Sequence, residues 1–104
     1  MRCVEFRAFR GTQRSSIYRS HVIGVDALDR IVEAAGQDGL GRLDPRRTQE
    51  LEPPAARRLA AQLTELRSSA VLLDLDGHLT ALAEVANWCA RSREKAWLRI
   101  SPRC

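Results

Sequence analysis

The two ends of this 104-residue sequence alternate between apolar and polar residues, the pattern of β-strands that bury one face. The first such run covers residues 3–10, and a second run, residues 17–23, follows a polar loop at 11–16. A third run covers residues 95–101. The short loop predicts that the first two runs form an antiparallel hairpin. A strand at the end of the chain needs a partner, and we expect it to pair with this hairpin.

Three helical patterns lie between these runs. The first has apolar residues at i, i+3, i+4 and i+7 over 28–35, with Asp26 as the expected N-cap. The second begins at Pro53-Pro54, because proline suits the first turn of a helix, and ends at Ser68-Ser69. The third, about 79–92, has a single narrow polar stripe, which predicts a mostly buried, central helix with its tryptophan inside.

These elements predict an α+β fold. A small, mainly antiparallel sheet, made of the N-terminal hairpin and the C-terminal strand, should carry about three helices on one face. Residues 37–51 contain the turn signal Asp44-Pro45 and predict either a short hairpin or a loop. The length allows one domain, residues 1–104, with a core of its own.

The charge of the chain is +4, and its basic residues are sixteen arginines and one lysine, Lys95. A basic chain is compatible with nucleic-acid binding. A GC-rich genome would also produce this arginine bias through codon usage, which weakens that argument. No run approaches the roughly 18 apolar residues of a membrane span, and residues 1–11 lack the apolar stretch of a signal peptide. We therefore expect a cytoplasmic protein that does not contact a membrane.

The three cysteines, Cys3, Cys89 and Cys104, stand at no metal-ligand spacing, and we expect neither a metal nor a cofactor. Cys89 falls in the third helical pattern, which favours a buried, inert thiol. If the first and last strands pair antiparallel, Cys3 and Cys104 could come within bridging range. In a reducing cytoplasm we expect free thiols.

Residues 71–79, VLLDLDGHL, resemble the first motif of the haloacid dehalogenase-type phosphohydrolases, an apolar strand followed by DxDG and usually Thr. The resemblance implies a nucleophilic Asp74 and a general acid/base Asp76 beside magnesium. The sequence departs from the motif at His78, and the 27 residues after Gly77 contain no aspartate and one lysine. We therefore expect structural roles, with Asp76 as the N-cap of the third helix.

The alternation also defines a candidate binding surface. If Val4, Phe6 and Ala8 of the first strand and Leu98 and Ile100 of the last face the helices, the alternation places Arg7, Phe9, Trp97 and Arg99 on the other face. Arg19 and His21 are expected to join them from the second strand. The candidate binding residues are Arg7, Phe9, Arg19, His21, Trp97 and Arg99. The alternative is that residues 37–51 fold over this face and make a second small core.

Exposed tryptophan, phenylalanine and arginine together are typical of a protein-binding hot spot. We expect a small non-catalytic module that binds another protein or a second copy of itself. The alternative is a nucleic-acid-binding domain that uses the same residues for stacking and phosphate contacts. A more distant alternative is a phosphohydrolase-like fragment around Asp74 and Asp76. Two arginine pairs, Arg46-Arg47 and Arg57-Arg58, could also lie near each other across the Pro53-Pro54 corner.

Overall fold

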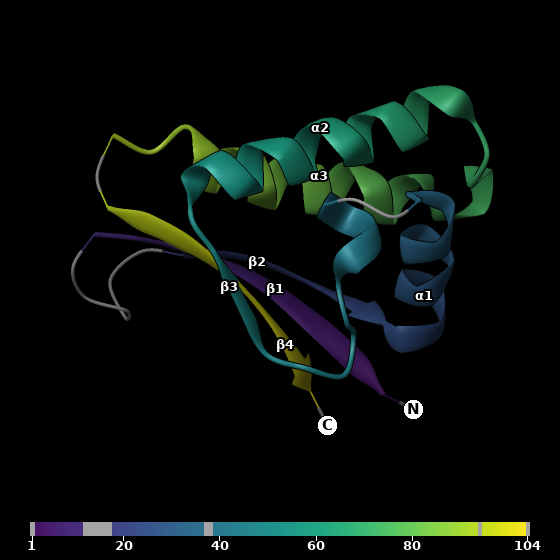
Figure 1. Ribbon diagram of the computed structural model, residues 1–104, viewed down its shortest axis with the longest axis horizontal. Helices are drawn as coiled ribbons and strands as arrows, with labels where there is room; N and C mark the ends of the chain where they lie inside the picture. Colours follow the sequence, from purple (N-terminus) through teal and green to yellow (C-terminus); the bar gives the residue numbers. More distant parts are fainter. Residues whose placement is uncertain (1, 12–17, 37–38, 94, 104) are drawn as a thin grey trace.

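The computed structural model describes residues 2–11, 18–36, 39–93 and 95–103, and it has the predicted α+β architecture. Its antiparallel sheet has the strand order β2-β1-β4-β3, and its helices lie on one face of that sheet (Figure 1). The strands are β1 (Cys3–Arg10), β2 (Tyr18–Gly24), β3 (Gln49–Leu51) and β4 (Ala96–Arg103). The helices are α1 (Val25–Ala34), α2 (Pro53–Ser69) and α3 (Asp76–Ala90), with 3-10 turns at Gly39–Arg42 and Leu73–Leu75.

The two ends of the chain form the centre of the sheet. Strands β1 and β4 pair along their whole lengths, from Cys3 opposite Arg103 to Arg10 opposite Ala96. The predicted pairing of the first and last strands is therefore confirmed, and so is the antiparallel hairpin of β1 and β2. Because two sequence-distant ends share this ladder, the sheet cannot form without both of them.

The inner face of the sheet is the floor of the hydrophobic core. Val4, Phe6 and Ala8 of β1 and Leu98 and Ile100 of β4 are all fully buried beneath the helices. The third helix lies over this face and packs along α2, as its single polar stripe predicts. The expected burial of Trp88 is wrong: Trp88 is half-buried at the end of α3, where the Arg10 guanidinium lies 4.0 Å from its ring centroid.

Neither predicted N-cap has that role. The chain passes directly from β2 into α1, so Gly24 takes the N-cap position and Asp26 lies in the first turn of the helix. The backbone N–H of Val25 donates a hydrogen bond to the backbone oxygen of Arg2 (3.0 Å). Leu75 takes the cap position of α3, and Asp76 is the first helical residue. Asp26 and Asp76 nevertheless lie in the first turns of their helices, where a carboxylate interacts favourably with the positive end of the helix dipole.

The uncertain region around residues 37–51 does not fold over the outer face. Its Gly39–Arg42 turn packs against α1 and α2, and the side-chain Oε1 of Gln62 accepts a hydrogen bond from the Leu40 N–H (2.7 Å). The segment then enters the sheet as β3, which pairs with β4 from Gln49 opposite Ile100 to Leu51 opposite Leu98. The described part of this segment thus neither forms a hairpin nor covers the outer face. None of the described helices lies on that face of the sheet (Figure 1).

The described helices include none that combines the length and apolar character needed to cross a bilayer.

Candidate functional site

Four of the predicted binding residues lie together on the outer face of the sheet. Phe9 of β1 stands directly opposite Trp97 of β4, and Arg7 stands directly opposite Arg99. Residues opposite each other across a ladder project from the same face, so these two neighbouring pairs form one patch. We call Arg7, Phe9, Trp97 and Arg99 the outer patch.

The aromatic pair of the outer patch is stacked. The rings of Phe9 and Trp97 have centroids 5.2 Å apart and planes inclined by 19°. The guanidinium carbon of Arg99 lies 5.5 Å from the centroid of the Phe9 ring. Phe9 is consequently only 4% exposed, so the expectation of an exposed phenylalanine is wrong. Trp97 is half-buried and forms the accessible part of the pair.

Carboxylates accompany the arginines of this face. Glu5 accepts hydrogen bonds from Arg7 (2.8 Å) and Arg103 (3.1 Å), and it is nearly buried between them. Glu50 of β3 pairs with Arg99 at 3.6 Å. The sequence analysis did not include Glu5, Glu50 or Arg103 among the candidate site residues. The parity of β1 already placed Glu5 on this face, whereas Glu50 could not be assigned because β3 was not predicted.

Arg19 and His21 do not join the outer patch. In β2, His21 stands opposite Phe6 and Arg19 stands opposite Ala8, and both opposing residues face the helices. The two β2 side chains therefore lie on the inner side of the sheet, and this prediction is wrong. Polar residues are tolerated there because β2 is the edge strand, where Arg19 is exposed and His21 is half-buried.

His21 contacts a second histidine instead. Its Nε2 lies 2.9 Å from Nδ1 of His78, near the start of α3, with ring centroids 5.1 Å apart. One neutral imidazole donates to the other in this contact, and a proton on each would remove the acceptor. Burial, together with the neighbouring His78, lowers the pKa of His21 below its ordinary value of 6.5.

The Asp-x-Asp-Gly segment lacks the strand that the phosphohydrolase resemblance implies. Residues 70–75 form turns and a 3-10 helix in place of the strand. Asp74 accepts two hydrogen bonds from Arg30 of α1 (2.6 and 3.1 Å), which lowers the pKa of that carboxyl. Asp76 accepts one from Arg67 of α2 (2.9 Å). Both carboxylates thus link α3 and its preceding turn to other helices.

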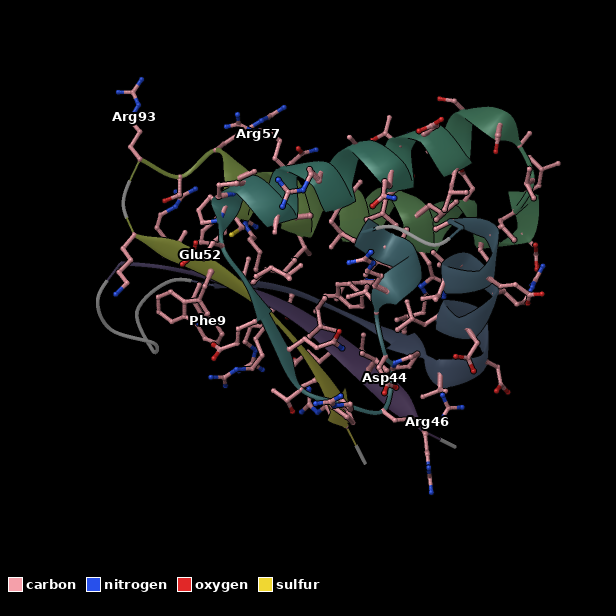
Figure 2. All side chains as sticks on the ribbon, viewed as in Figure 1. Phe9, Asp44, Arg46, Glu52, Arg57 and Arg93 are labelled. Atoms are coloured by element: carbon pink, nitrogen blue, oxygen red, sulfur yellow. The ribbon has the colours of Figure 1, made fainter. Side chains whose placement is uncertain are left out.

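The arginine pairs do not form a common surface. Figure 2 shows Arg46 and Arg57 at opposite ends of the molecule. Arg46 pairs with Asp29 at 3.5 Å, and Arg57 donates to the backbone oxygen of Ala90 at the end of α3 (3.5 Å). The suggestion that these pairs lie close together across the Pro53-Pro54 corner is wrong.

The cysteines match the sequence expectation as far as they are described. Cys89 is fully buried, and this burial raises the pKa of its thiol to about 11. Cys3 is a free thiol opposite Arg103, while Cys104 and any bridge to it lie outside the described residues. No cluster of three or more potential metal ligands occurs in the part of the chain that the structure describes.

No protein-family model, curated protein or solved structure matches this chain. The functional argument therefore rests on the geometry of the outer patch and its surroundings.

Proposed function

We propose that this chain is a small, non-catalytic, cytoplasmic module that binds another protein, or a second copy of itself, through the outer patch. The stack of Trp97 on Phe9 carries the proposal. A large aromatic ring is held in one orientation by its neighbour and still keeps part of its surface in water. Binding to such a ring costs little side-chain entropy and buries much apolar area.

The arginines around this ring favour a protein partner over a nucleic acid. Arg7 and Arg103 share the carboxylate of Glu5, and Arg99 pairs with Glu50. A phosphate backbone would have to compete with these carboxylates and would meet their negative charge. A protein surface can supply both charges, so it can complement this mixture of arginine and glutamate.

A binding experiment with matched variants tests the proposal. The tagged protein and its Trp97→Ala variant are used to recover partners from host lysate, with and without nuclease and over a range of salt. Leu73→Ala is the control, because Leu73 is 73% exposed on the helical side of the molecule. We expect Trp97→Ala to weaken capture by at least about thirtyfold, as for an interface hot spot, and Leu73→Ala to have no effect. Sedimentation of the purified protein measures self-association in parallel.

Three results would contradict it. Capture that survives Trp97→Ala in a folded protein would place the binding surface elsewhere. Nuclease-sensitive capture with a steep loss in salt would favour the nucleic-acid alternative. A magnesium-dependent phosphatase activity that disappears in Asp74→Asn would support the phosphohydrolase alternative and overturn the non-catalytic assignment.

A further inference from the structure

Strand β2 has an open edge in the part of the chain that the structure describes. It stands first in the order β2-β1-β4-β3, and among the described strands it pairs with β1 alone, from Gly24 opposite Cys3 to Tyr18 opposite Phe9. In an antiparallel edge strand, alternate residues direct both their N–H and their C=O groups away from the sheet. The seven residues of β2 therefore offer a row of ladder hydrogen bonds to a further strand.

A groove of about 420 Å³ lies beside this edge, between β2 and α3. Its walls include Arg19 and His21 of β2 and Ala81, Glu84, Val85 and Trp88 of α3. The four helix residues are spaced at i, i+3, i+4 and i+7, so they form one face of α3. Because side chains alternate along a strand, a segment added to β2 would place every second side chain in this β2–α3 groove.

Contacts near both ends of α3 hold the walls of the groove in place. Near the start of the helix, Nδ1 of His78 lies 2.9 Å from Nε2 of His21. Near its end, the Arg10 guanidinium donates a hydrogen bond to the backbone oxygen of Trp88 (3.2 Å) and lies over the indole ring. The helix is thus fixed to the sheet on both sides of the groove. Little rearrangement is then needed for a segment to bind there.

Two charges of the groove have no ion-pair partner among the described residues, Arg19 and Glu84, and both are exposed. Arg19 stands opposite Ala8, so it lies on the helical side of the edge. An apolar strand that paired with β2 would remove this guanidinium from water without compensation. A strand with an acidic residue directly opposite Arg19 would avoid that cost.

We infer that an extended segment of another protein adds to β2 as a further strand and places an acidic side chain opposite Arg19. The neighbouring side chains that enter the groove are apolar, because Ala81, Val85 and Trp88 form an apolar wall. Glu84 opposes the incoming carboxylate, but it stands across the groove on α3, whereas Arg19 lies on the strand that the segment pairs with. This surface is separate from the outer patch, so the inference does not rest on the proposed function.

A second copy of this chain fits the edge less well. The sequence of β2, Tyr18–Gly24, contains no acidic residue. Pairing β2 with itself would therefore bring no carboxylate from the opposing strand to Arg19.

Peptides of defined sequence test this inference. The probe is a seven-residue peptide of alternating threonine and valine, blocked at both ends, with glutamate in place of the central valine. Matched peptides carry glutamine or lysine at that position. A fourth peptide has the glutamate sequence but is N-methylated throughout, so it has no backbone N–H to donate. Binding is followed by the backbone N–H signals of β2 in NMR spectra.

We expect saturable binding of the glutamate peptide and increased protection of the β2 amides from hydrogen exchange. The glutamine peptide should bind about fivefold more weakly and the lysine peptide at least about tenfold more weakly, because the charge opposite Arg19 is first lost and then reversed. The N-methylated peptide should not bind, since the ladder needs its donors.

Matched variants locate the site. Arg19→Gln should weaken binding of the glutamate peptide about fivefold and remove its advantage over the glutamine peptide. Glu84→Gln should strengthen binding about twofold at low salt. Arg58→Gln and Glu65→Gln make the same charge changes at exposed positions of α2 and should have no effect. Thermal melting of each variant confirms that it is folded.

The outcomes separate this inference from the proposed function. No saturable binding, a preference for the lysine peptide, equal binding of the N-methylated peptide, or an unchanged preference in Arg19→Gln would overturn it, even where Trp97→Ala abolishes partner capture. Self-association that an excess of the glutamate peptide abolishes would also overturn it, because the occupant would then be a second copy. Peptide binding with the expected variant effects that persists in Trp97→Ala would support it, whatever the fate of the outer patch.

Discussion

The two faces of the sheet are stabilised in different ways. On β1 and β4 the inner face is apolar and covered by the helices, with Phe6, Leu98 and Ile100 completely removed from water. Among the residues that the structure describes, the outer face is covered by its own side chains, through the Phe9–Trp97 stack and the ion pairs of Glu5 and Glu50. The inner face therefore supplies most of the stability. The outer face can be changed at smaller cost, which is the property a binding surface requires.

Deletion of residues 95–104 is the most drastic way to test this comparison. It removes β4, which lies between β1 and β3, and with it the inner residues Leu98 and Ile100. We expect the truncated chain to lose its cooperative thermal transition, measured by circular dichroism. A truncated chain that still melts cooperatively would show that the hydrophobic core does not depend on β4.

Adjacent residues of β4 allow the two faces to be compared directly. Leu98→Ala empties a fully buried position and should lower the free energy of unfolding by about 2–5 kcal/mol. Trp97→Ala removes a half-buried ring from the outer face and should cost about 1–2 kcal/mol, mostly through lost contact with Phe9. Urea unfolding of both variants measures the difference. Equal losses would mean that the outer face is a second core.

The ion pairs of the outer face should contribute less than the stack. Glu5→Gln removes the charge that Arg7 and Arg103 share, but both arginines keep part of their solvation. We expect a loss of about 1 kcal/mol at low salt that shrinks as salt is added. Urea unfolding at two salt concentrations checks this, with Glu65→Gln as control. A loss that is independent of salt would contradict the electrostatic explanation.

Lowering the pH should destabilise the protein through His21 at the inner edge of the sheet, and we expect this to be the smallest of the four effects on stability. Because the pKa of His21 is lowered below 6.5 in the folded protein, the unfolded chain binds a proton more readily. Stability is then greatest above about pH 6.5 and falls as pH drops through the lowered pKa. Arg19 and Glu84 line the groove beside His21 and carry the neighbouring charges. His21→Gln should flatten the pH dependence of the melting temperature, and an unchanged profile would rule out this histidine as its source.

The alternation of β1 and β4 predicted the outer patch correctly because both strands have one apolar side under the helices. The same reasoning failed in β2. Arg19 and His21 looked like outer residues because they are polar, yet the register that sets their face depends on the turn, which alternation does not encode. The edge position then leaves inner-side polar groups in contact with water or with each other.

Contacts between segments that are far apart in the chain could not be predicted from the sequence. Nothing local links His21 to His78, Asp74 to Arg30, or Glu50 to Arg99, because each pair is created by packing or strand order. Strand β3 has three residues, too few for a period to be recognised. The groove between β2 and α3 depends on how the helix packs on the sheet, so it could not be predicted from the chain alone.

The shortness of β3 also limits how copies of this protein could polymerise. An exposed strand edge is a template on which another chain can grow, and prolines interrupt such growth because they offer no N–H. Strand β3 ends at Leu51, and only Glu52 separates it from Pro53 and Pro54, so this edge is a poor template for another strand. The long edge is β2, on the far side of the sheet from Glu52. Strand-to-strand assembly would therefore have to begin at β2, and it would leave the surface beside Trp97 open.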